Sequence, residues 1–310
     1  MRVSTAGLKI LVLRGGALGD LILTLPVLDA LRTENRRSFI ELWGIQPQVG
    51  LVESADRIDR LDSLEFAPLF VPGPLPFALQ RRVGAFDLAV SFLSDPEEVV
   101  AGHLASAGIR RVIKAAPIRQ PGVHAVYQLA SVLETLGLRL RAPVPRLEIA
   151  RDQSREAALG FHLGSGSLQK NWPFDRWSDF AQRIAPRFER LILMGGEADE
   201  ERTRKFQRGW RGSALEVMRQ SSLPELARAL GECAVFVGHD TGLSHLAAAV
   251  QTPTVALFGP TDPGIWRPLG DHVKVIRSVN GRMDNISVAA VLEAVGQPGD
   301  FSGARERDGK

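Results

Sequence analysis

Apolar and polar residues along the chain fall into two alternating patterns. Short runs of consecutive apolar residues occur at 9–14, 38–44 and 87–93, whereas 124–138 has apolar positions at helical spacing. Continuous apolar runs are typical of strands covered on both faces, and helical spacing is typical of amphipathic helices. Strands that alternate with helices predict a parallel sheet with helices packed over it.

The alternation occurs twice along the chain. The first series also has expected helices at 21–32 and 97–108 and an extended stretch at 110–116. The segment 138–153 then brings two prolines and many charges, which is typical of a linker. The second series has expected strands at 158–164, 190–196, 214–219, 233–239 and 252–260, and expected helices at 175–188, 198–210, 223–232, 241–251 and 286–296.

The two series predict an α/β fold with two Rossmann-like, doubly wound domains. We expect domains at 1–145 and 146–300, followed by a disordered polar tail at 301–310. The strand at 252–260 is the last that the pattern predicts. Ligands of such sheets bind beyond the carboxyl ends of the strands, so two facing domains would form a cleft with the chemistry at strand ends.

The turn RGGALGD, residues 14–20, connects the first expected strand and helix. Its glycines, Gly16 among them, allow a ligand to approach the backbone closely. The spacing fits neither the GxxxxGK[ST] phosphate loop nor the GxGxxG dinucleotide loop. Asp20 has two interpretations: it caps the helix, or it acts as a general base at a strand end.

The loop in FHLGSGSLQKNWP, residues 161–173, is the second candidate. Backbone N–H groups and hydroxyls of Ser165, Gly166 and Ser167 can hold phosphate oxygens, and Lys170 adds a mobile positive charge. The alternative is a flexible surface loop with a solvated lysine.

The strand end MGGEADEER, residues 194–202, is the third candidate. Met194 and the backbone at Gly195 are expected to contact a nucleobase, and Asp199 or a neighbouring acid to bind ribose hydroxyls. The alternative is that these acids complement the helix dipole and face solvent.

The stretch GHDTGLSHL, residues 238–246, directly follows an apolar run. A helix that begins at Thr241, Gly242 and Leu243 directs free N–H groups at an anion such as a diphosphate. Asp240 is then suited to sugar hydroxyls or to capping, because a carboxylate repels phosphate. His245 lies one turn into the helix, where it either reaches the same anion or is structural.

Composition narrows the function classes. The chain has 310 residues, 45% hydrophobic and 24% charged, as expected of a globular protein with a large core. Its formal charge of +3 is too small to indicate a nucleic acid partner. The single cysteine, Cys233, lies in an apolar run and is expected to be buried.

Other motifs are absent from the sequence. There is no Cys cluster, HExxH motif or DxD pair, so a metal site is not expected, and GSGSL does not fit a nucleophile elbow. The apolar N-terminal stretch is interrupted by Arg14 and Asp20, so neither a signal peptide nor a spanning helix is expected. These features favour a cytoplasmic protein and are compatible with contact at a membrane surface.

Taken together, the motifs resemble glycosyltransferase family nine, the heptosyltransferases. The resemblance rests on LVLRGGALGDLILTLPVLDALR, GSGSLQKNWP and GHDTGLSHLAAA followed by PTVALFGPTDP, which occur in both halves in the expected order. It implies a GT-B fold and inverting, metal-independent transfer from ADP-heptose, which is a substrate rather than a cofactor. The implied acceptor is the lipopolysaccharide inner core, at the inner face of the cytoplasmic membrane.

The resemblance also implies roles for particular residues. Asp20 matches the family's general base and Lys170 its phosphate-contacting lysine. The donor-binding turn matches Asp240, Thr241, Gly242 and His245. Asp199 corresponds by spacing to an acid that binds ribose and is commonly glutamate. The Gly-Ser loop replaces a Thr-Thr pair found in some members, which leaves the donor sugar less defined.

The acceptor is expected to contact the first domain. GIRRVIKAAPIRQPGVH offers basic side chains suited to a phosphorylated or carboxylated saccharide, and with Gly16 they form the expected acceptor site: Arg110, Arg111, Lys114, Arg119 and His124. The alternative is a solvated basic face, or one that attracts an anionic membrane.

Three further functions fit parts of the sequence. They are a transferase that uses another nucleotide sugar on a different glycan or on protein, a sugar-nucleotide-binding module without catalysis, and a two-domain epimerase or NAD enzyme. Asp20 argues against the module, and the absent GxGxxG argues against NAD. Nucleotide specificity separates these alternatives.

Overall fold

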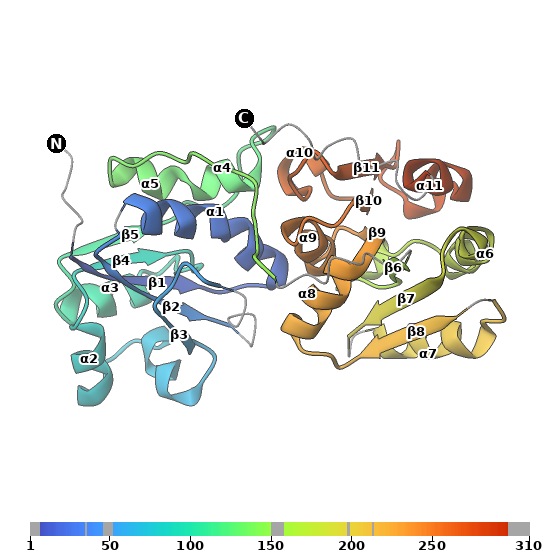
Figure 1. Ribbon diagram of the computed structural model, residues 1–310. Coiled ribbons are helices and arrows are strands. Elements are labelled where there is room, and N and C mark those ends of the chain that lie inside the picture. The colour runs from blue at the N-terminus through green and yellow to red at the C-terminus, as the bar shows by residue number, and fades with distance from the viewer. Residues whose placement is uncertain are drawn as a thin grey trace. The chain divides into compact units, whose positions relative to one another are not determined.

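The computed structural model describes residues 7–34, 36–45, 52–149, 158–196, 199–212 and 214–296. The chain forms two compact units, Met1–Pro145 and Arg146–Lys310, here called unit 1 and unit 2 (Figure 1). The expected tail at 301–310 lies outside the described residues. Among the described residues, no helix has the length and apolar character needed to cross a bilayer.

Unit 1 contains a parallel sheet in the strand order β3-β2-β1-β4-β5. Its strands are β1 (Lys9–Arg14), β2 (Phe39–Gly44), β3 (Arg57–Arg60), β4 (Leu88–Ser91) and β5 (Arg111–Lys114). Its helices are α1 (Leu18–Glu34), η2 (Leu64–Phe70), α2 (Phe77–Val83), α3 (Val99–Ser106), α4 (Ala125–Leu129) and α5 (Ser131–Thr135), where η marks a 3₁₀ helix.

Unit 2 contains a second parallel sheet in the order β11-β10-β9-β6-β7-β8. Its strands are β6 (Ala158–His162), β7 (Arg190–Gly195), β8 (Leu215–Arg219), β9 (Cys233–His239), β10 (Thr254–Phe258) and β11 (Val273–Arg277). Its helices are η3 (Leu168–Lys170), α6 (Phe174–Ile184), η4 (Ala185–Arg187), α7 (Glu200–Gly209), α8 (Leu223–Glu232), α9 (Gly242–Ala249), α10 (Pro263–Trp266), η6 (Met283–Asn285) and α11 (Val288–Val295).

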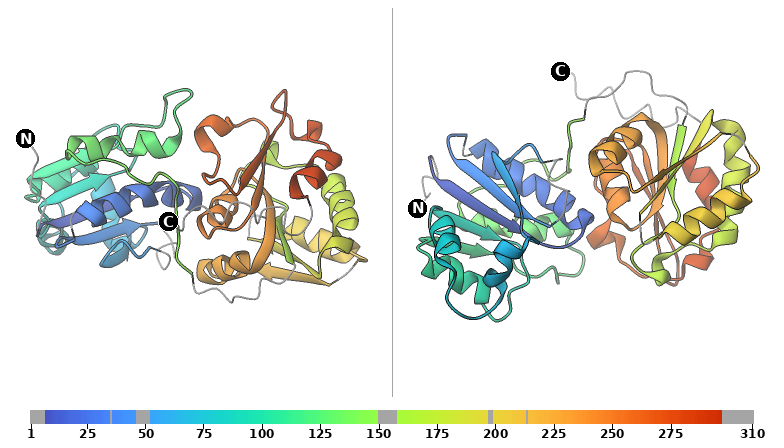
Figure 2. Two further views of the ribbon diagram at one scale, coloured as in Figure 1. Left: turned by 45° about the horizontal axis from the view of Figure 1, so that its top comes forward. Right: turned by 90° about the horizontal axis from the view of Figure 1, so that it is seen from below.

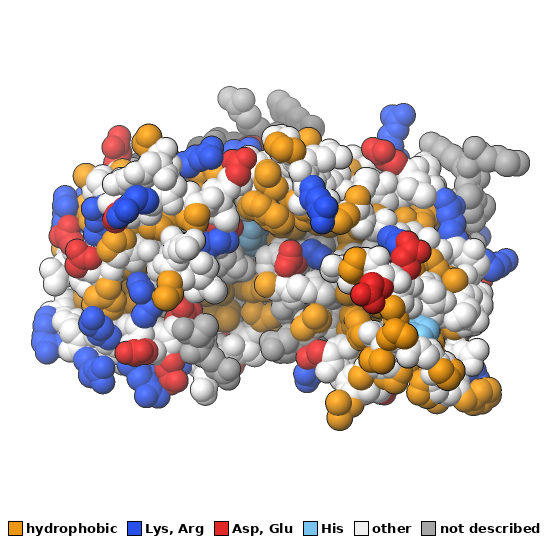
Figure 3. Space-filling model, turned by 180° about the vertical axis from the view of Figure 1, so that it is seen from behind, with side chains coloured by type: hydrophobic (Ala, Val, Ile, Leu, Met, Phe, Trp, Pro, Cys, Tyr) orange, Lys and Arg blue, Asp and Glu red, His pale blue; other side chains and the backbone are white. Residues whose placement is uncertain are grey.

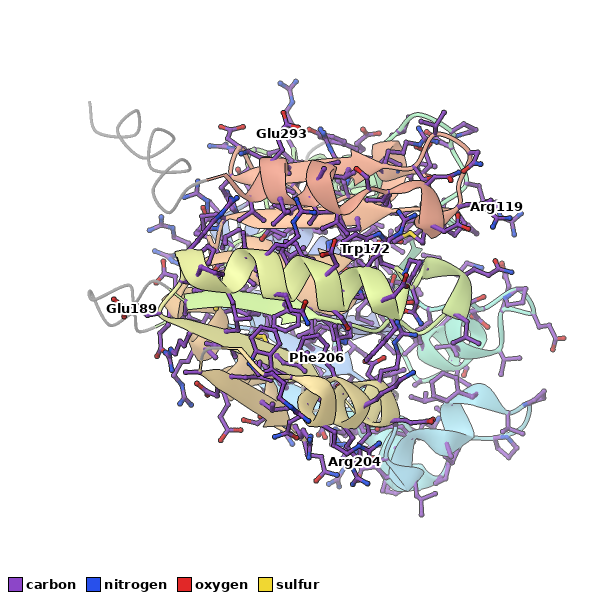
Figure 4. The ribbon with its side chains drawn as sticks, turned by 90° about the vertical axis from the view of Figure 1, so that its right-hand side faces the viewer. Arg119, Trp172, Glu189, Arg204, Phe206 and Glu293 are labelled. Atoms are coloured by element: carbon purple, nitrogen blue, oxygen red, sulfur yellow. The ribbon has the colours of Figure 1, made fainter. Side chains whose placement is uncertain are left out.

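Helices cover both faces of the unit 2 sheet, so its central strands are buried on each side (Figure 2). Figure 4 shows α11, α6 and α7 side by side over one face, with Trp172 between α11 and α6 and Phe206 between α6 and α7. Trp172 packs edge-on against Trp177 at 5.0 Å between ring centroids. Both indoles are fully buried, and removal of one such side chain costs about 3–5 kcal/mol of stability.

The core of unit 1 follows from the apolar runs of its strands. Ile10, Leu11, Val12 and Leu13 of β1 are fully buried, as expected of a central strand in a parallel sheet. Trp43 of β2 packs against Phe66 of η2 at 4.4 Å between ring centroids. The structure thus confirms the predicted α/β class with parallel sheets.

The structure differs from the expected elements at strands and at one helix. Strands β3, RIDR, and β11, VKVIR, were not predicted because they lie at sheet edges and lack a continuous apolar run. The single helix expected at 124–138 is two short helices. The Ser131 hydroxyl donates to the Gln128 carbonyl at 2.7 Å, an alternative to the helical bonding pattern at the junction.

Each sheet has one point where the chain reverses its direction of growth. In unit 1 the chain runs from β1 outward to β3 and then returns to β4 on the other side of β1. In unit 2 it runs from β6 to β8 and returns to β9 on the other side of β6. Ligands of open α/β sheets bind at such switch points. The turn 14–20 follows β1 at the switch point of unit 1. The segments that follow β6 and β9 lie at the switch point of unit 2.

Candidate active site

Asp20 lies at the switch point of unit 1, in the first turn of α1. Its Oδ2 accepts a hydrogen bond from the Ala17 N–H at 2.9 Å, so the carboxylate satisfies one of the free donors at the helix start. The side chain keeps 33% of its surface exposed. Asp20 therefore caps its helix and still presents a carboxylate at the strand end, which joins the two interpretations of the sequence.

Arg14 binds the backbone of this turn. Its guanidinium donates to the Asp20 carbonyl from Nε at 3.1 Å and from Nη2 at 2.9 Å, and to the Phe92 carbonyl from Nη1 at 3.3 Å. Nη2 also lies 3.3 Å from Asp20 Oδ1. Burial lowers the pKa of Arg14, and the charge of Asp20 opposes that shift. Sequence analysis did not assign a role to Arg14, although a charged residue at the end of a buried strand was a usable signal.

Gly16 is required by this geometry. Its φ of +92° lies in the left-handed region, and a Cβ at this position would be 2.5 Å from Asp20 Oδ2. A side chain here would displace the carboxylate. Gly16 therefore shapes the Asp20 turn, whereas its expected contact with an acceptor stays a prediction.

Lys170 and Asp240 form the centre of the unit 2 switch point. Lys170 Nζ donates to Asp240 Oδ2 at 2.7 Å, although the residues are 70 positions apart. The Asp240 side chain is only 10% exposed and that of Lys170 is 28% exposed. The lysine is thus held at the strand edge by an ion pair, contrary to the alternative of a solvated side chain.

The helix α9 begins next to this ion pair. Its N-cap is Thr241, whose side chain makes no capping hydrogen bond, and whose buried hydroxyl has no partner among the described residues. Thr241, Gly242 and Leu243 are all partly exposed. The N–H groups of this first turn are therefore suited to an external acceptor of hydrogen bonds.

His239 fixes the two ends of the loop that carries Lys170. The ring is fully buried, and its Nδ1 contacts the Gly164 carbonyl at 2.9 Å while its Nε2 accepts from the Trp172 N–H at 2.8 Å. The contact with an N–H assigns the proton to Nδ1, which then donates to Gly164. Burial lowers the pKa of His239 to about 3. This neutral clamp was missed by the sequence analysis, although His239 directly precedes Asp240.

Asp199 is buried beside the same loop. It is 6% exposed, and its Oδ2 lies 2.7 Å from His162 Nε2. A Cβ on Gly164 would come within 1.5 Å of Asp199 Oδ1, so only glycine fits there. In this structure Asp199 is engaged by the protein, and its expected contact with a ribose stays a prediction.

Two further donor-site residues are also less accessible than expected. Met194 is fully buried, so its side chain offers no surface to a nucleobase here, whereas the neighbouring Gly195 is partly exposed. His245 is 5% exposed, and its N–H bonds to the Thr241 carbonyl in the first turn of α9. The described conformation thus supports a structural role for both side chains.

The Gly-Ser loop is ordered by its own side chains. The Ser165 hydroxyl donates to the Ser167 carbonyl at 2.6 Å and accepts from the Ser167 N–H at 3.3 Å. Gly166 at the tip is exposed. The loop leads directly into η3 and Lys170, so phosphate binding there would use a pre-formed backbone.

The structure separates the basic residues that were expected to bind the acceptor. Arg110 and Arg111 lie at the amino end of β5, where Arg110 pairs with Asp87, and Asp87 in turn accepts from the N–H of Lys9. Asp20 follows the carboxyl end of the parallel strand β1, so these arginines lie at the opposite end of the sheet from Asp20, and their expected contact with the acceptor stays a prediction. The alignment of the parallel strands decides at which end of the sheet a residue lies. The order of residues along the chain does not show this.

The other expected acceptor residues lie at or after the carboxyl end of β5. Lys114 pairs with Glu98 at 2.5 Å, and Arg119 is exposed, as Figure 4 shows. His124 is 7% exposed and caps α4 by accepting from the Val126 N–H at 3.3 Å. Lys114 and Arg119 therefore remain the candidates for contact with an anionic acceptor.

No group of three or more His, Cys, Asp or Glu side chains is arranged to hold a metal ion in the part of the chain that the structure describes. Cys233 is buried, as expected, and burial raises its pKa to about 12.

Solved structures define the class of this fold. A glycosyl transferase family 9 protein from Veillonella parvula DSM 2008 has a TM-score of 0.80 at 20% identity, over 94% of this chain and 97% of that one. The E. coli heptosyltransferase WaaC with ADP has a TM-score of 0.72 at 21% identity, over 91% and 97%. The chain has the GT-B fold of these glycosyltransferases.

The family follows from the sequence comparisons. The model of glycosyltransferase family 9 (heptosyltransferase) matches residues 98–295, more than half of the chain. Lipopolysaccharide heptosyltransferase 1 of Escherichia coli K12 is 35% identical over 125 residues, which are 40% of this chain and 39% of that protein. The match thus spans about two fifths of that relative's length. The protein belongs to glycosyltransferase family 9.

Proposed function

We propose that this protein is an inverting, metal-independent heptosyltransferase. It transfers heptose from ADP-heptose to a lipopolysaccharide inner-core saccharide, uses no cofactor, and acts in the cytoplasm with peripheral contact at the inner membrane face. The observation that carries the proposal is which residues lie at the two switch points. One presents the Asp20 carboxylate, and the other presents Lys170, Asp240 and the open start of α9.

Asp20 supplies the acceptor half of the reaction. The carboxylate removes the proton from the acceptor hydroxyl as that oxygen attacks the anomeric carbon from the face opposite the nucleotide, which inverts the configuration. A positioned base of this kind contributes roughly 10²–10⁴-fold in rate. The contacts of Asp20 with Arg14 and Ala17 fix its position, so little reorganisation is needed.

The unit 2 switch point supplies the donor half. The bond from the anomeric carbon to the diphosphate oxygen breaks, and ADP leaves with the electron pair. Lys170 and the N–H groups at Thr241–Leu243 face this developing charge, and fixed donors of this kind are most effective where water is excluded. Asp240, as a carboxylate, suits sugar hydroxyls.

The ion pair between Lys170 and Asp240 has a consequence for donor binding. Lys170 contacts the diphosphate only if it leaves or shares its 2.7 Å bond to Asp240. The sugar hydroxyls then replace the lysine at the carboxylate. The ion pair therefore holds both side chains at the switch point. When the donor binds, this one internal bond is replaced by two bonds to the donor.

The relatives support the choice of donor. Several proteins similar to this chain are heptosyltransferases, and one of the similar solved structures contains ADP-2-deoxy-2-fluoro heptose. The tip of the Gly-Ser loop is exposed and Gly195 is partly exposed, so both are accessible to a nucleotide.

Calorimetry with ADP, UDP, GDP and NAD tests the donor assignment. We expect selective binding of ADP, and a loss of about tenfold or more in affinity in Lys170→Ala, since a charge-assisted contact contributes about 1.5–3 kcal/mol. Asp240→Asn is the matched control: it removes the competing charge, so ADP affinity is kept or rises while sugar transfer falls. Binding of UDP or GDP in place of ADP would indicate that the donor sugar is not heptose. Binding of NAD would overturn the proposed sugar transfer.

A further inference from the structure

A surface pocket of unit 1 lies outside the site described above. It is lined by residues of α4 and α5 and by the segment 137–140 that follows them, and its volume is about 620 Å³. Figure 1 shows the chain after α5 running back alongside both helices. The volume falls within the range of about 300–1,000 Å³ that is usual for small-molecule sites. The pocket is therefore large enough to hold a ligand.

The end of α5 explains why a pocket forms here. Gly137 has a φ of +72°, in the left-handed region, and the Leu138 N–H donates to the Leu133 carbonyl at 2.8 Å. A glycine in this conformation commonly ends a helix and reverses the chain. After the reversal, Arg139 lines the same pocket as the side chains of α4 and α5.

The pocket is separate from the switch point of unit 1. Its described lining residues all lie between 127 and 140. Arg111, at the amino end of β5, donates to the Thr135 carbonyl at the end of α5. The end of α5 thus lies at the amino end of the parallel sheet, whereas Asp20 follows the carboxyl end of β1. A ligand in the pocket would occupy a second site.

Tyr127 gives the pocket an aromatic wall. The residue is 52% exposed, and the ring of His124 packs edge-on against it with 6.5 Å between ring centroids. The face of an aromatic ring carries partial negative charge and attracts weakly positive groups such as C–H bonds. A tyrosine ring that is both exposed and supported from one side is suited to stack against the face of a sugar ring.

Two opposite charges line the pocket without forming ion pairs. Elsewhere on the surface, acidic and basic side chains lie side by side, as Figure 3 shows for one face. Glu134 and Arg139 are both exposed, and neither forms an ion pair with a described residue. The carboxylate accepts hydrogen bonds and the guanidinium donates them. The pocket thus offers both kinds of hydrogen bond beside an aromatic face.

This combination discriminates between classes of ligand. Glu134 would repel a phosphate or a carboxylate, and Arg139 would repel an amine. A purely apolar ligand would cover both charges without replacing their hydrogen bonds to water. The hydroxyls of a neutral saccharide both donate and accept, and the faces of its rings carry C–H groups, so it satisfies all three side chains. A small zwitterion such as an amino acid matches the charges but fills only part of the pocket.

We propose that this pocket is a second binding site of the protein, for a short neutral saccharide. One sugar ring stacks on Tyr127, and its hydroxyls donate to Glu134 and accept from Arg139. Binding here needs neither the nucleotide sugar nor Asp20. Only its consequence rests on the proposed function: a glycan held on unit 1 raises the local concentration of acceptor at the enzyme.

Tyr127 provides a selective readout, because it is the only tyrosine in the chain. NMR of the full chain, isotope-labelled in the tyrosine ring, reports on this ring alone while maltose, lactose or mannobiose is added. We expect at least one of these neutral disaccharides to shift the ring signals with a Kd of about 1 mM, as for a site with few contacts. Absence of a shift with all of them, at concentrations well above this value, overturns the proposal.

Glu134→Ala and Arg139→Ala each remove one hydrogen-bonding group from the pocket. Each should weaken disaccharide binding about tenfold, the loss expected for a hydrogen bond to a charged group. Arg183→Ala is the matched control, since Arg183 is a half-exposed arginine on α6 of unit 2, and it should bind as the wild type does. Thermal unfolding and ADP calorimetry should be unchanged in all these variants, so that a folding defect is recognised. Unchanged disaccharide affinity in both pocket variants contradicts the proposal.

Other ligands test the chemical class of the site. Tighter binding of a sugar phosphate or of free phenylalanine than of the neutral disaccharides would assign the pocket to an anion or a zwitterion, and would overturn the proposal. The titration also separates this site from the proposed function. Loss of the ADP assignment with the Tyr127 shifts intact would leave the saccharide site standing, whereas ADP binding without any Tyr127 shift would remove the saccharide site alone.

Discussion

The two switch points differ in where their contacts come from. Asp20 bonds to Arg14, Ala17 and Thr24, all within six positions of it in the chain. In unit 2, Lys170 bonds to Asp240 across 70 positions, and His239 bonds to Trp172 across 67. The contacts of Asp20 itself lie within one strand and helix, although Arg14 also bonds to the Phe92 carbonyl across 78 positions. The contact between Lys170 and Asp240 exists only when two distant parts of a sheet are paired.

Because of this difference, we expect substitutions at the two switch points to differ in their effect on stability. A substitution at Asp20 changes a locally assembled turn, so its effect should be confined to the reaction. A substitution at the unit 2 site removes contacts that also hold the sheet and its loop together. We therefore expect unit 2 variants to change stability and ligand binding at the same time.

Asp20→Asn should have the largest effect. The amide oxygen can still accept from Ala17 N–H, so the turn is kept, but the base is lost and turnover should fall roughly 10²–10⁴-fold. Steady-state kinetics with a heptose donor and acceptor measures this. ADP affinity and the thermal midpoint are the controls and should match the wild type. Unchanged turnover would end the assignment of Asp20 as base.

His239→Gln tests the contacts that hold the unit 2 switch point. The amide can replace one of the two buried ring contacts but not both, and an unsatisfied buried group costs about 1–3 kcal/mol. ADP affinity should also fall because the loop that carries Lys170 loses one of its two attachments. A variant with native stability and native ADP affinity would show that the clamp is not needed.

The pH dependence of this variant gives an independent test. Burial holds the pKa of His239 at about 3 in the folded protein, below its value of about 6.5 in the unfolded chain. Between these values the unfolded chain takes up a proton that the folded protein does not, so the wild type loses stability as the pH falls. Since glutamine does not titrate, the stability difference between the two should narrow by about 2 kcal/mol from pH 7 to pH 5. Parallel pH profiles in urea unfolding would contradict this.

The same contrast explains how much of the site could be predicted. The turn at Asp20 could be predicted from a run of seven residues, because its geometry is local. The Gly-Ser loop and the turn after β9 could also be recognised, but their pairing needs the order β9-β6-β7, in which residues 70 positions apart become neighbours.

Burial was the other property that the sequence did not provide. Asp199 and Met194 lie at the expected strand end, yet both are turned into unit 2 and Asp199 is engaged by His162. A pattern places a residue at a strand end but does not determine which neighbour its side chain meets. The edge strands β3 and β11 were missed for a related reason, since partial exposure lets them carry polar residues.

The smallest expected effect tests the separation of the two ends of the unit 1 sheet. Arg110 lies at the amino end of β5 and pairs with Asp87, and Lys114 lies at the carboxyl end. Because β1 spans six residues, its two ends are roughly 16 Å apart, so an acceptor at Asp20 is closer to Lys114. Arg110→Gln should remove only an exposed ion pair, with less than about 1 kcal/mol lost and the acceptor KM unchanged.

Lys114→Gln is the companion measurement and should raise the acceptor KM if that lysine contacts an anionic group. Its own ion pair with Glu98 is also partly exposed, so the two substitutions have similar effects on stability and differ only in position along the strand. Equal KM values for both variants, raised together, would mean that the acceptor reaches along the sheet. A rise for Lys114→Gln alone assigns acceptor binding to the strand ends at which Asp20 stands.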